Sequence, residues 1–242
     1  MNLLATDLDG TLIGDHDALQ DFVECMAPAR DRILIAYVTG RSLRSVLSVI
    51  ENTAAPVPDF ILPGLGSDIY RAPSWDSDWT WHDHLSRDWD RERVVSIARQ
   101  YGSLVPQPLE NQAIHKVSFH VRPPGCGRVV EDIRDRFMLE SVPAKVVYSS
   151  GRDVDLIPLR GGKGEAVRHL VRHLGLTMDR VLTVGDSGND EDMLRLGCHA
   201  AVVANAQAEL HGNIPGHVYR ARSSHAAGIL EALHHVGWLG EP

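Results

Sequence analysis

The sequence contains little cysteine and no long apolar segment. Only 3 of the 242 residues are cysteine, at positions 25, 126 and 198, and no two of them form a C-x-x-C pair. This spacing argues against a thiolate zinc site or a disulfide framework, and it fits a reducing compartment. We find no signal peptide and no run of about 18 apolar residues, so we expect a soluble cytoplasmic protein that makes no use of a membrane.

Blocks of like charge are also missing. The formal net charge is −8, and acidic and basic residues are spread along the chain. A nucleic-acid surface would need a basic patch, so we expect no nucleic-acid partner. Hydrophobic residues make up 43% of the chain, which is enough for one large domain or for a core with a smaller module.

Apolar runs of strand length alternate with helical spacing near the N-terminus. Apolar runs at 2–6, 33–38 and 60–62 predict buried strands, and the segments between them predict two helices, of which the second has Ser42 as its N-cap. This order predicts an α/β fold built on a doubly wound, Rossmann-like parallel sheet.

The pattern changes in the middle of the chain and then resumes. Residues 82–156 predict a small α+β module, with a possible hairpin of strands 144–149 and 153–157, and a group of tryptophans precedes and enters it. We expect the tryptophans to pack at the junction of the two modules rather than to stack on a ligand. We therefore predict a core domain of residues 1–81 and 157–242, interrupted by an inserted domain of residues 82–156.

Two aspartates follow the first predicted strand. Asp7 and Asp9 are two positions apart, so in extended backbone their side chains point the same way, and Gly10 permits a sharp turn after them. Two close carboxylates repel unless they bind a cation or one holds a proton, and phosphoryl transfer can use both states. Taken alone, the pair could also be an acidic turn after a strand.

Two further polar segments occur near strand ends. Thr39 and Gly40 open the turn after the second strand, where a hydroxyl and free N–H groups can hold phosphoryl oxygens, or can simply cap a helix. Lys163 stands at a helix start, where the helix dipole disfavours a cation. This placement indicates that Lys163 faces a negative group, although a solvated loop lysine is the alternative.

A last acidic turn follows a buried strand near position 184. Asp186, Asn189 and Asp190 lie in the string G-D-S-G-N-D before a short helix. Hard carboxylate oxygens suit Mg²⁺, which takes few carboxylates together with water and phosphate oxygens. The alternative is an acidic helix N-terminus that only complements the dipole. Because the carboxyl ends of parallel strands line one crevice, we expect these segments to meet.

Together these four segments resemble the motifs of haloacid dehalogenase phosphatases. They are D-x-D-G-T, T-G-R, the glycine-flanked lysine and G-D-S-G-N-D-x-x-M, and the insert lies between the second and the third, as in members that carry an α+β cap there. Over nearly the whole chain the sequence resembles the sucrose-phosphate phosphatase-like family. That resemblance rests on the chain length and on segments 58–61, 66–70 and 151–158, together with Gln107, Gln112, Lys116 and Ser118.

The resemblance implies a Mg²⁺-dependent phosphatase that acts on a phosphorylated disaccharide or related glycoside of the sucrose 6-phosphate or mannosylfructose-phosphate type. It implies that Asp7 is the nucleophile and Asp9 the general acid and base. Mg²⁺ would be held by the Asp7 carboxylate, the Asp9 carbonyl and Asp186, with Asp190 behind them. The implied phosphoryl-binding residues are Asp7, Thr39, Gly40, Lys163 and Asn189.

Polar residues of the insert and of the loop after the third strand are candidate sugar contacts. Gly66-Ser67-Asp68 stands where the family would have Gly-Thr-Glu, so the preferred sugar is open, as is the oligomeric state. For each candidate the alternative is a solvated surface residue. The candidates are Ser67, Asp68, Gln112, Lys116, Ser150 and Asp153.

Three other functions fit the same scaffold. The chain could be a glycosyl-3-phosphoglycerate phosphatase or, less readily, another sugar phosphatase or phosphohexomutase. A catalytically silent partner of a sugar-phosphate synthase would need a broken site, whereas every motif here is intact. An active enzyme could still associate with the synthase that makes its substrate.

Overall fold

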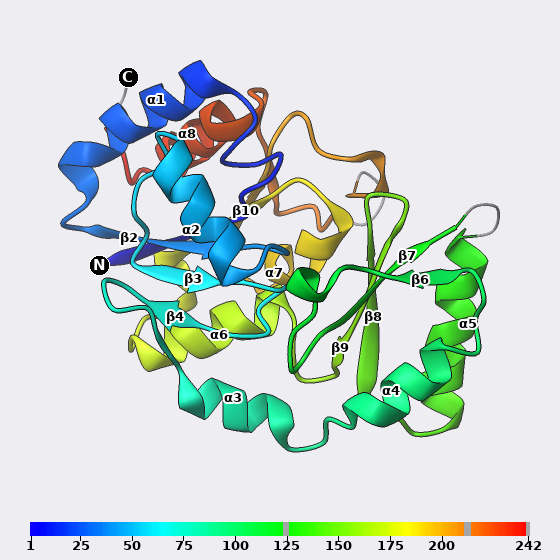
Figure 1. Cartoon of the computed structure of the whole chain (residues 1–242). Coiled ribbons are helices and arrows are strands. Elements are labelled where there is room, and N and C mark those ends of the chain that lie inside the picture. The colour runs from blue at the N-terminus through cyan, green and yellow to red at the C-terminus, as the bar shows by residue number, and fades with distance from the viewer. Residues whose placement is uncertain (123–125, 211–213, 241–242) are drawn as a thin grey trace.

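The computed structural model describes residues 1–122, 126–210 and 214–240. Its larger part is a sheet in the order β12-β11-β10-β1-β2-β3-β4-β5 (Figure 1), in which the first six strands are parallel and the last two antiparallel. This confirms the predicted α/β fold. The strands are β1 (Asn2–Thr6), β2 (Ile33–Val38), β3 (Phe60–Leu62), β4 (Tyr70–Arg71), β5 (Asp76–Ser77), β10 (Val181–Gly185), β11 (His199–Val202) and β12 (Tyr219–Arg220).

Helices cover both faces of this sheet (Figure 1). Leu4 packs in one hydrophobic cluster, whereas its neighbours Leu3 and Ala5 pack in another, as the alternation of a strand requires. One face carries α1 (His16–Met26), α2 (Leu43–Asn52) and α8 (His225–His235), and the other carries α3 (Trp79–Ser86), α6 (Lys163–His173) and α7 (Glu191–Leu194). Both faces are thus buried, and the carboxylates of Asp7 and Asp186 come just after the carboxyl ends of β1 and β10.

The inserted segment forms a second, smaller module, which we call the cap (right side of Figure 1). Its antiparallel sheet has the order β6-β7-β9-β8, and α4 and α5 pack against it. Ser149 pairs with Asp153, which confirms the predicted hairpin. The elements are α4 (Arg91–Ala98), β6 (Leu104–Pro106), β7 (Val117–Val121), α5 (Cys126–Leu139), β8 (Ala144–Ser149) and β9 (Asp153–Pro158).

Packing shows how the two modules divide the chain near the predicted limits. Leu85, in α3, packs in a core cluster, whereas Val154 and Leu156, in β9, pack in the cap cluster. The limits at 82 and 156 remain a prediction about independently folding units.

Most of the tryptophans contribute to packing, although Trp79 is 72% exposed, and none lines the site cavity within the described residues. Trp81 is buried in the core and its Nε1 donates to the Gly66 carbonyl at 3.0 Å. Trp89 packs against the cap cluster and donates to the Ile114 carbonyl at 2.8 Å. In the described part of the chain, no helix combines the length and apolar character needed to cross a bilayer.

Candidate active site

The carboxyl ends of the central strands bring distant residues together. The backbone N–H of Asp7 donates to the Val184 carbonyl at 3.0 Å, so β1 and β10 deliver Asp7 and Asp186 side by side. Thr39 follows β2 on the other side of β1. A cavity of about 410 Å³ opens above these strand ends, and its far wall comes from the cap.

Lys163 is the buried centre of this site. The residue is only 1% exposed, and Nζ donates to Asp7 Oδ1 at 2.8 Å and to Asp190 Oδ1 at 2.7 Å. Burial acts to lower the pKa of Lys163, but the carboxylates of Asp190 and Asp7 outweigh it and raise the pKa above its ordinary value. The lysine therefore stays charged, and the solvated-loop alternative does not apply.

Asp190 holds both Lys163 and the loop around Asp186. While Oδ1 contacts Lys163, Oδ2 accepts hydrogen bonds from the backbone N–H groups of Asp186 and Ser187, both at 3.0 Å. Asp190 is fully buried. Because both of its oxygens are already engaged, its geometry suits a residue behind a metal site better than a direct ligand.

Three carboxylates gather at this site, of which Asp7 and Asp186 are free to face an ion. Ligand oxygens of Asp7, Asp186 and Asp190 lie within 4.8 Å of one another, and no other such group of histidine, cysteine or acidic residues occurs in residues 1–122, 126–210 and 214–240. One lysine against three carboxylates leaves two negative charges uncompensated when all are ionised. This excess fits a divalent cation with hard oxygen ligands.

The pKa values report the same excess charge. Burial, followed by repulsion from Asp190 and Asp186, raises the pKa of Asp7 well above its ordinary value despite Lys163. Burial and the charge of Asp190 raise the pKa of Asp186 to about 7. Thr11 Oγ1 donates to Asp186 Oδ1 at 2.8 Å and fixes its orientation. Gly10, with φ +77°, passes so close that a Cβ would lie 2.5 Å from Asp186 Oδ2.

Asp9 differs from its neighbour Asp7. Its side chain is 53% exposed, and the guanidinium of Arg41 donates to both of its oxygens, with Nε 2.7 Å from Oδ2 and Nη2 2.6 Å from Oδ1. The Arg41 N–H donates to Thr39 Oγ1 at 3.2 Å, so one turn orders both residues. The sequence interpretation gave Arg41 no role, although it is the third residue of T-G-R.

The predicted phosphoryl-binding residues face one cavity. Asp7, Thr39, Gly40 and Asn189 line it, and Lys163 lies beneath Asp7. The Oδ1 atom of Asn189 is buried and has no hydrogen-bond partner among the described residues, so it is available to a ligand. Their individual roles remain proposals.

The predicted sugar contacts divide into two groups. Lys116, Ser150 and Asp153 line the site cavity, and Ser67, Asp68 and Gln112 line a smaller cavity of about 170 Å³ that shares Gly40, Asn111 and Lys116 with it. The Gln112 amide is already bonded to the backbone of Gln107 and Ser118, and Asp68 to Ile69, Tyr70 and Ser77.

Several cavity residues had no assigned role. Asp155 follows Asp153 by two positions on the same strand face, and Gln107 belongs to the segments that carried the family resemblance, so both could have been found. Asn111, Arg152 and Gln207 carry no such signal, because only the folded loops bring them to the site. The lining residues without a predicted contact role are Arg41, Leu65, Gln107, Asn111, Ser149, Arg152, Asp155, Ser187 and Gln207.

Comparison with known proteins identifies the family. The family model described as sucrose-6F-phosphate phosphohydrolase matches residues 1–237. The chain belongs to this family. The resemblance drawn from the sequence is thus confirmed, including its place among haloacid dehalogenase phosphatases.

Individual relatives cover the chain almost completely. The structure of the sucrose-phosphatase from Synechocystis sp. in complex with sucrose and phosphate superposes with a TM-score of 0.93, at 36% identity over 97% of both chains. Mannosylfructose-phosphate phosphatase from Agrobacterium fabrum is 27% identical over 98% of this chain and 97% of its own. Sucrose-phosphatase 2 from Nicotiana tabacum is 31% identical over 96% of this chain, which spans only 58% of the tobacco protein.

Proposed function

We propose that the protein is a Mg²⁺-dependent phosphatase that hydrolyses the phosphate monoester of a phosphorylated disaccharide or related glycoside, with sucrose 6-phosphate as the first candidate. The observation that carries this is the buried Asp7–Lys163–Asp190 network at the base of a cavity whose far wall is formed by polar cap residues. The similarity to a sucrose-phosphatase solved with sucrose and phosphate supports the choice of sugar.

In the proposed reaction Asp7 attacks phosphorus and forms an aspartyl-phosphate as the bond from phosphorus to the sugar oxygen breaks. Asp9 gives its proton to that oxygen and then takes a proton from the water that attacks the phosphorus and frees phosphate. For this, one Asp9 oxygen must leave Arg41. Lys163 Nζ donates to Asp7 Oδ1 at 2.8 Å and so orients the nucleophile, and its positive charge would stabilise the phosphoryl oxygens.

The carboxylate cluster supports the assignment of a metal. Asp7, the Asp9 carbonyl and Asp186 would hold Mg²⁺, while Asp190 keeps Lys163 and the loop in place. When bound, Mg²⁺ would screen the repulsion between the nucleophile and the phosphate and neutralise developing charge.

A screen of phosphate release tests the proposal. Substrates would be sucrose 6-phosphate, mannosylfructose phosphate, trehalose 6-phosphate, glucosylglycerol phosphate and the glycosyl-3-phosphoglycerates, each with Mg²⁺ and with EDTA. We expect Mg²⁺-dependent release to be fastest from sucrose 6-phosphate. Preference for a phosphoglycerate would replace the proposed substrate with the rival one, and no release from any substrate would reject the activity.

We also infer association with the synthase that makes the substrate. A protein named glucosylglycerol-phosphate synthase, from Pseudomonas anguilliseptica, is 30% identical over 99% of this chain, which spans only 31% of it. That relationship supports proximity between synthesis and hydrolysis, and it favours glucosylglycerol phosphate as a second substrate. Size-exclusion chromatography of this protein mixed with a purified sugar-phosphate synthase from the same organism tests the association. We expect the two proteins to co-elute, and separate elution at micromolar concentrations would contradict the association.

A further inference from the structure

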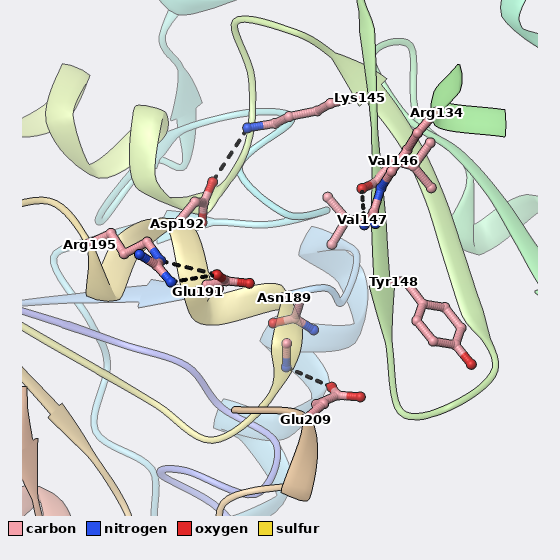
Figure 2. Close-up of a pocket in the computed structure, with 11 residues that line it drawn as sticks. Arg134, Lys145, Val146, Val147, Tyr148, Asn189, Glu191, Asp192, Arg195 and Glu209 are labelled. Carbon is pink, nitrogen blue, oxygen red and sulfur yellow. Dashed lines mark hydrogen bonds and ion pairs between the residues drawn. The ribbon is translucent and has the colours of Figure 1, made fainter. Parts of the chain in front are cut away.

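A second cavity lies between the cap and the core, next to the proposed catalytic site. It has a volume of about 490 Å³, and Asn189 lines both this cavity and the site cavity. Figure 2 shows residues 145–148 of the cap strand β8 on one side, and on the other the two core segments that carry Asn189 and Glu209. Lys145 Nζ of the cap lies 3.6 Å from Asp192 Oδ2 of the core. The cavity therefore lies along a seam, the line where the cap and the core come into contact.

Glu209 contacts both the proposed catalytic loop and the cap. Its Oε1 accepts a hydrogen bond from the backbone N–H of Gly188 at 2.7 Å, drawn in Figure 2, and another from the N–H of Ser150 at 3.3 Å. Gly188 lies two residues after Asp186, in the loop proposed to bind the metal. Ser150 lies in the cap turn between β8 and β9 and lines the site cavity. One carboxylate oxygen thus joins the cap to the loop.

The segment that carries Glu209 is itself anchored to the site. The backbone N–H of Gln207 donates to the Asp186 carbonyl at 2.7 Å, and Leu210 is buried in a hydrophobic cluster of the core. Glu209 lies between them in a short 3₁₀ turn, Ala208–Leu210. The backbone on both sides of Glu209 is therefore held in place, and this fixes where its carboxylate lies.

The cap and the core are packed closely around Gly188. A Cβ on Gly188 would lie 2.8 Å from Glu209 Oε1 and 3.0 Å from the Tyr148 carbonyl of the cap. Glycine allows the cap backbone, the catalytic loop and Glu209 to meet. Next to this contact, Ser150 has φ +54°, which is unusual for a residue with a side chain.

We infer that Glu209 is a positioning residue that couples closure of the cap to the placement of the Asp186–Asp190 loop. This inference rests on the proposed function, since it assumes that the cap covers a sugar phosphate. When the Ser150 turn docks on Glu209, the carboxylate holds that turn and the Gly188 backbone in one arrangement. Sugar-binding residues and the phosphoryl site then reach their working geometry together.

The test compares Glu209→Ala with the matched control Glu209→Gln, which keeps a carbonyl oxygen that can accept both hydrogen bonds. The kinetic readout is the ratio of kcat/KM for sucrose 6-phosphate to that for p-nitrophenyl phosphate, which has no sugar to cover. We expect Glu209→Ala to lower this ratio at least about tenfold, and Glu209→Gln to keep it within about threefold. Equal losses on both substrates, or no loss, would overturn the inference.

A second readout does not need the substrate. Spin labels on the exposed native Cys25 in the core and on Asp135→Cys in cap helix α5, in a Cys126→Ser background, report the distance between core and cap. We expect a broader and longer distance distribution for Glu209→Ala than for Glu209→Gln. Identical distributions would overturn the inference. If wild type hydrolysed no sugar phosphate while the distances changed as expected, the proposed function would fail and the coupling would stand.

Discussion

The core and the cap meet the same cavity with different kinds of polar residues. In the core, Asp7 and Lys163 are 4% and 1% exposed and are bonded to each other. In the cap, the side chains of Asp153 and Arg152 are 24% and 69% exposed. The proposed nucleophile and its lysine are thus held in a dry setting, where their interaction is strong, whereas Asp153 and Arg152 of the cap stay partly solvated. Each region has an exception: the side chain of Asp9 in the core is 53% exposed, and Lys116 of the cap is buried, with its Nζ 3.2 Å from Asp155 Oδ1.

The largest effect is expected from a change of the proposed nucleophile, Asp7, in the buried half of the site. Asp7→Asn removes the attacking oxygen and a proposed metal ligand together, while the volume is unchanged. We expect kcat to fall at least about 10³-fold on sucrose 6-phosphate and on p-nitrophenyl phosphate alike. Asp9→Asn, which keeps its backbone carbonyl but carries no transferable proton, should lose about 10²–10⁴-fold. Steady-state kinetics would contradict the aspartyl-phosphate route if Asp7→Asn kept full activity.

The core half of the site could be predicted because it depends on strand ends. Asp7 follows β1 and Asp186 follows β10, and these strands are parallel neighbours. The apolar runs predict where these strands end, and in a parallel sheet the carboxyl ends of neighbouring strands lie at the same edge. What the pattern could not show is the partner of each charge: Asp190 shares its oxygens between Lys163 and the backbone, and Arg41 holds Asp9.

The second largest effect concerns stability. Lys163→Met leaves the carboxylates of Asp7 and Asp190 buried without their cation, which should cost about 3–5 kcal/mol of unfolding free energy at pH 7 without metal, besides abolishing activity. The matched control is Lys145→Met, which breaks the 3.6 Å pair with Asp192, whose side chains are 29% and 36% exposed. That variant should lose less than about 1 kcal/mol. Urea unfolding measures both, and equal losses would contradict the contrast between the buried pair and the partly exposed one.

A smaller effect would sharpen the role of the cap. Asp153→Ala removes a carboxylate that lines the cavity and that His120 Nδ1 and Gln107 Nε2 contact at 2.7 and 3.3 Å. We expect kcat/KM for the sugar phosphate to fall about ten- to hundredfold, with little change for p-nitrophenyl phosphate.

Gln112→Ala is the informative comparison for Asp153→Ala. Its amide holds the backbone of Gln107 and Ser118. Both substrates should therefore be affected equally, together with a lower melting temperature. A selective loss in Gln112→Ala, or an unselective one in Asp153→Ala, would reverse the assignment of the two residues.

The cap and the short elements were harder to predict for a physical reason. Strands of two residues, such as β4, β5 and β12, are too short to leave a periodic pattern and form by pairing at the edge of the sheet. Helix α3 carries two tryptophans and two histidines on a short segment, and its apolar face becomes evident only when Trp81 and Leu85 meet the core. Glu209, likewise, carries no motif, since its importance comes from loops that fold around it.

A pH-dependent effect tests the junction between the two regions. His115 is 2% exposed, its Nε2 lies 2.9 Å from Ser86 Oγ of α3, and its ring lies 4.6 Å from that of His82. Burial, followed by the charge of His82, lowers the pKa of His115 from 6.5 to about 4, although Asp68 acts in the opposite direction.

Because this pKa is lower in the folded state, the unfolded chain binds the proton first as the pH falls. The contribution of His115 to stability is therefore fully present above about pH 6.5 and is lost towards pH 4. Wild type should lose about 1–3 kcal/mol more unfolding free energy between pH 7 and pH 4.5 than His115→Gln, which cannot titrate. The other titrating groups are common to both proteins and cancel in this difference. Urea unfolding at the two pH values gives the result, and parallel losses in the two proteins would show that His115 is not a pH-sensitive part of the junction.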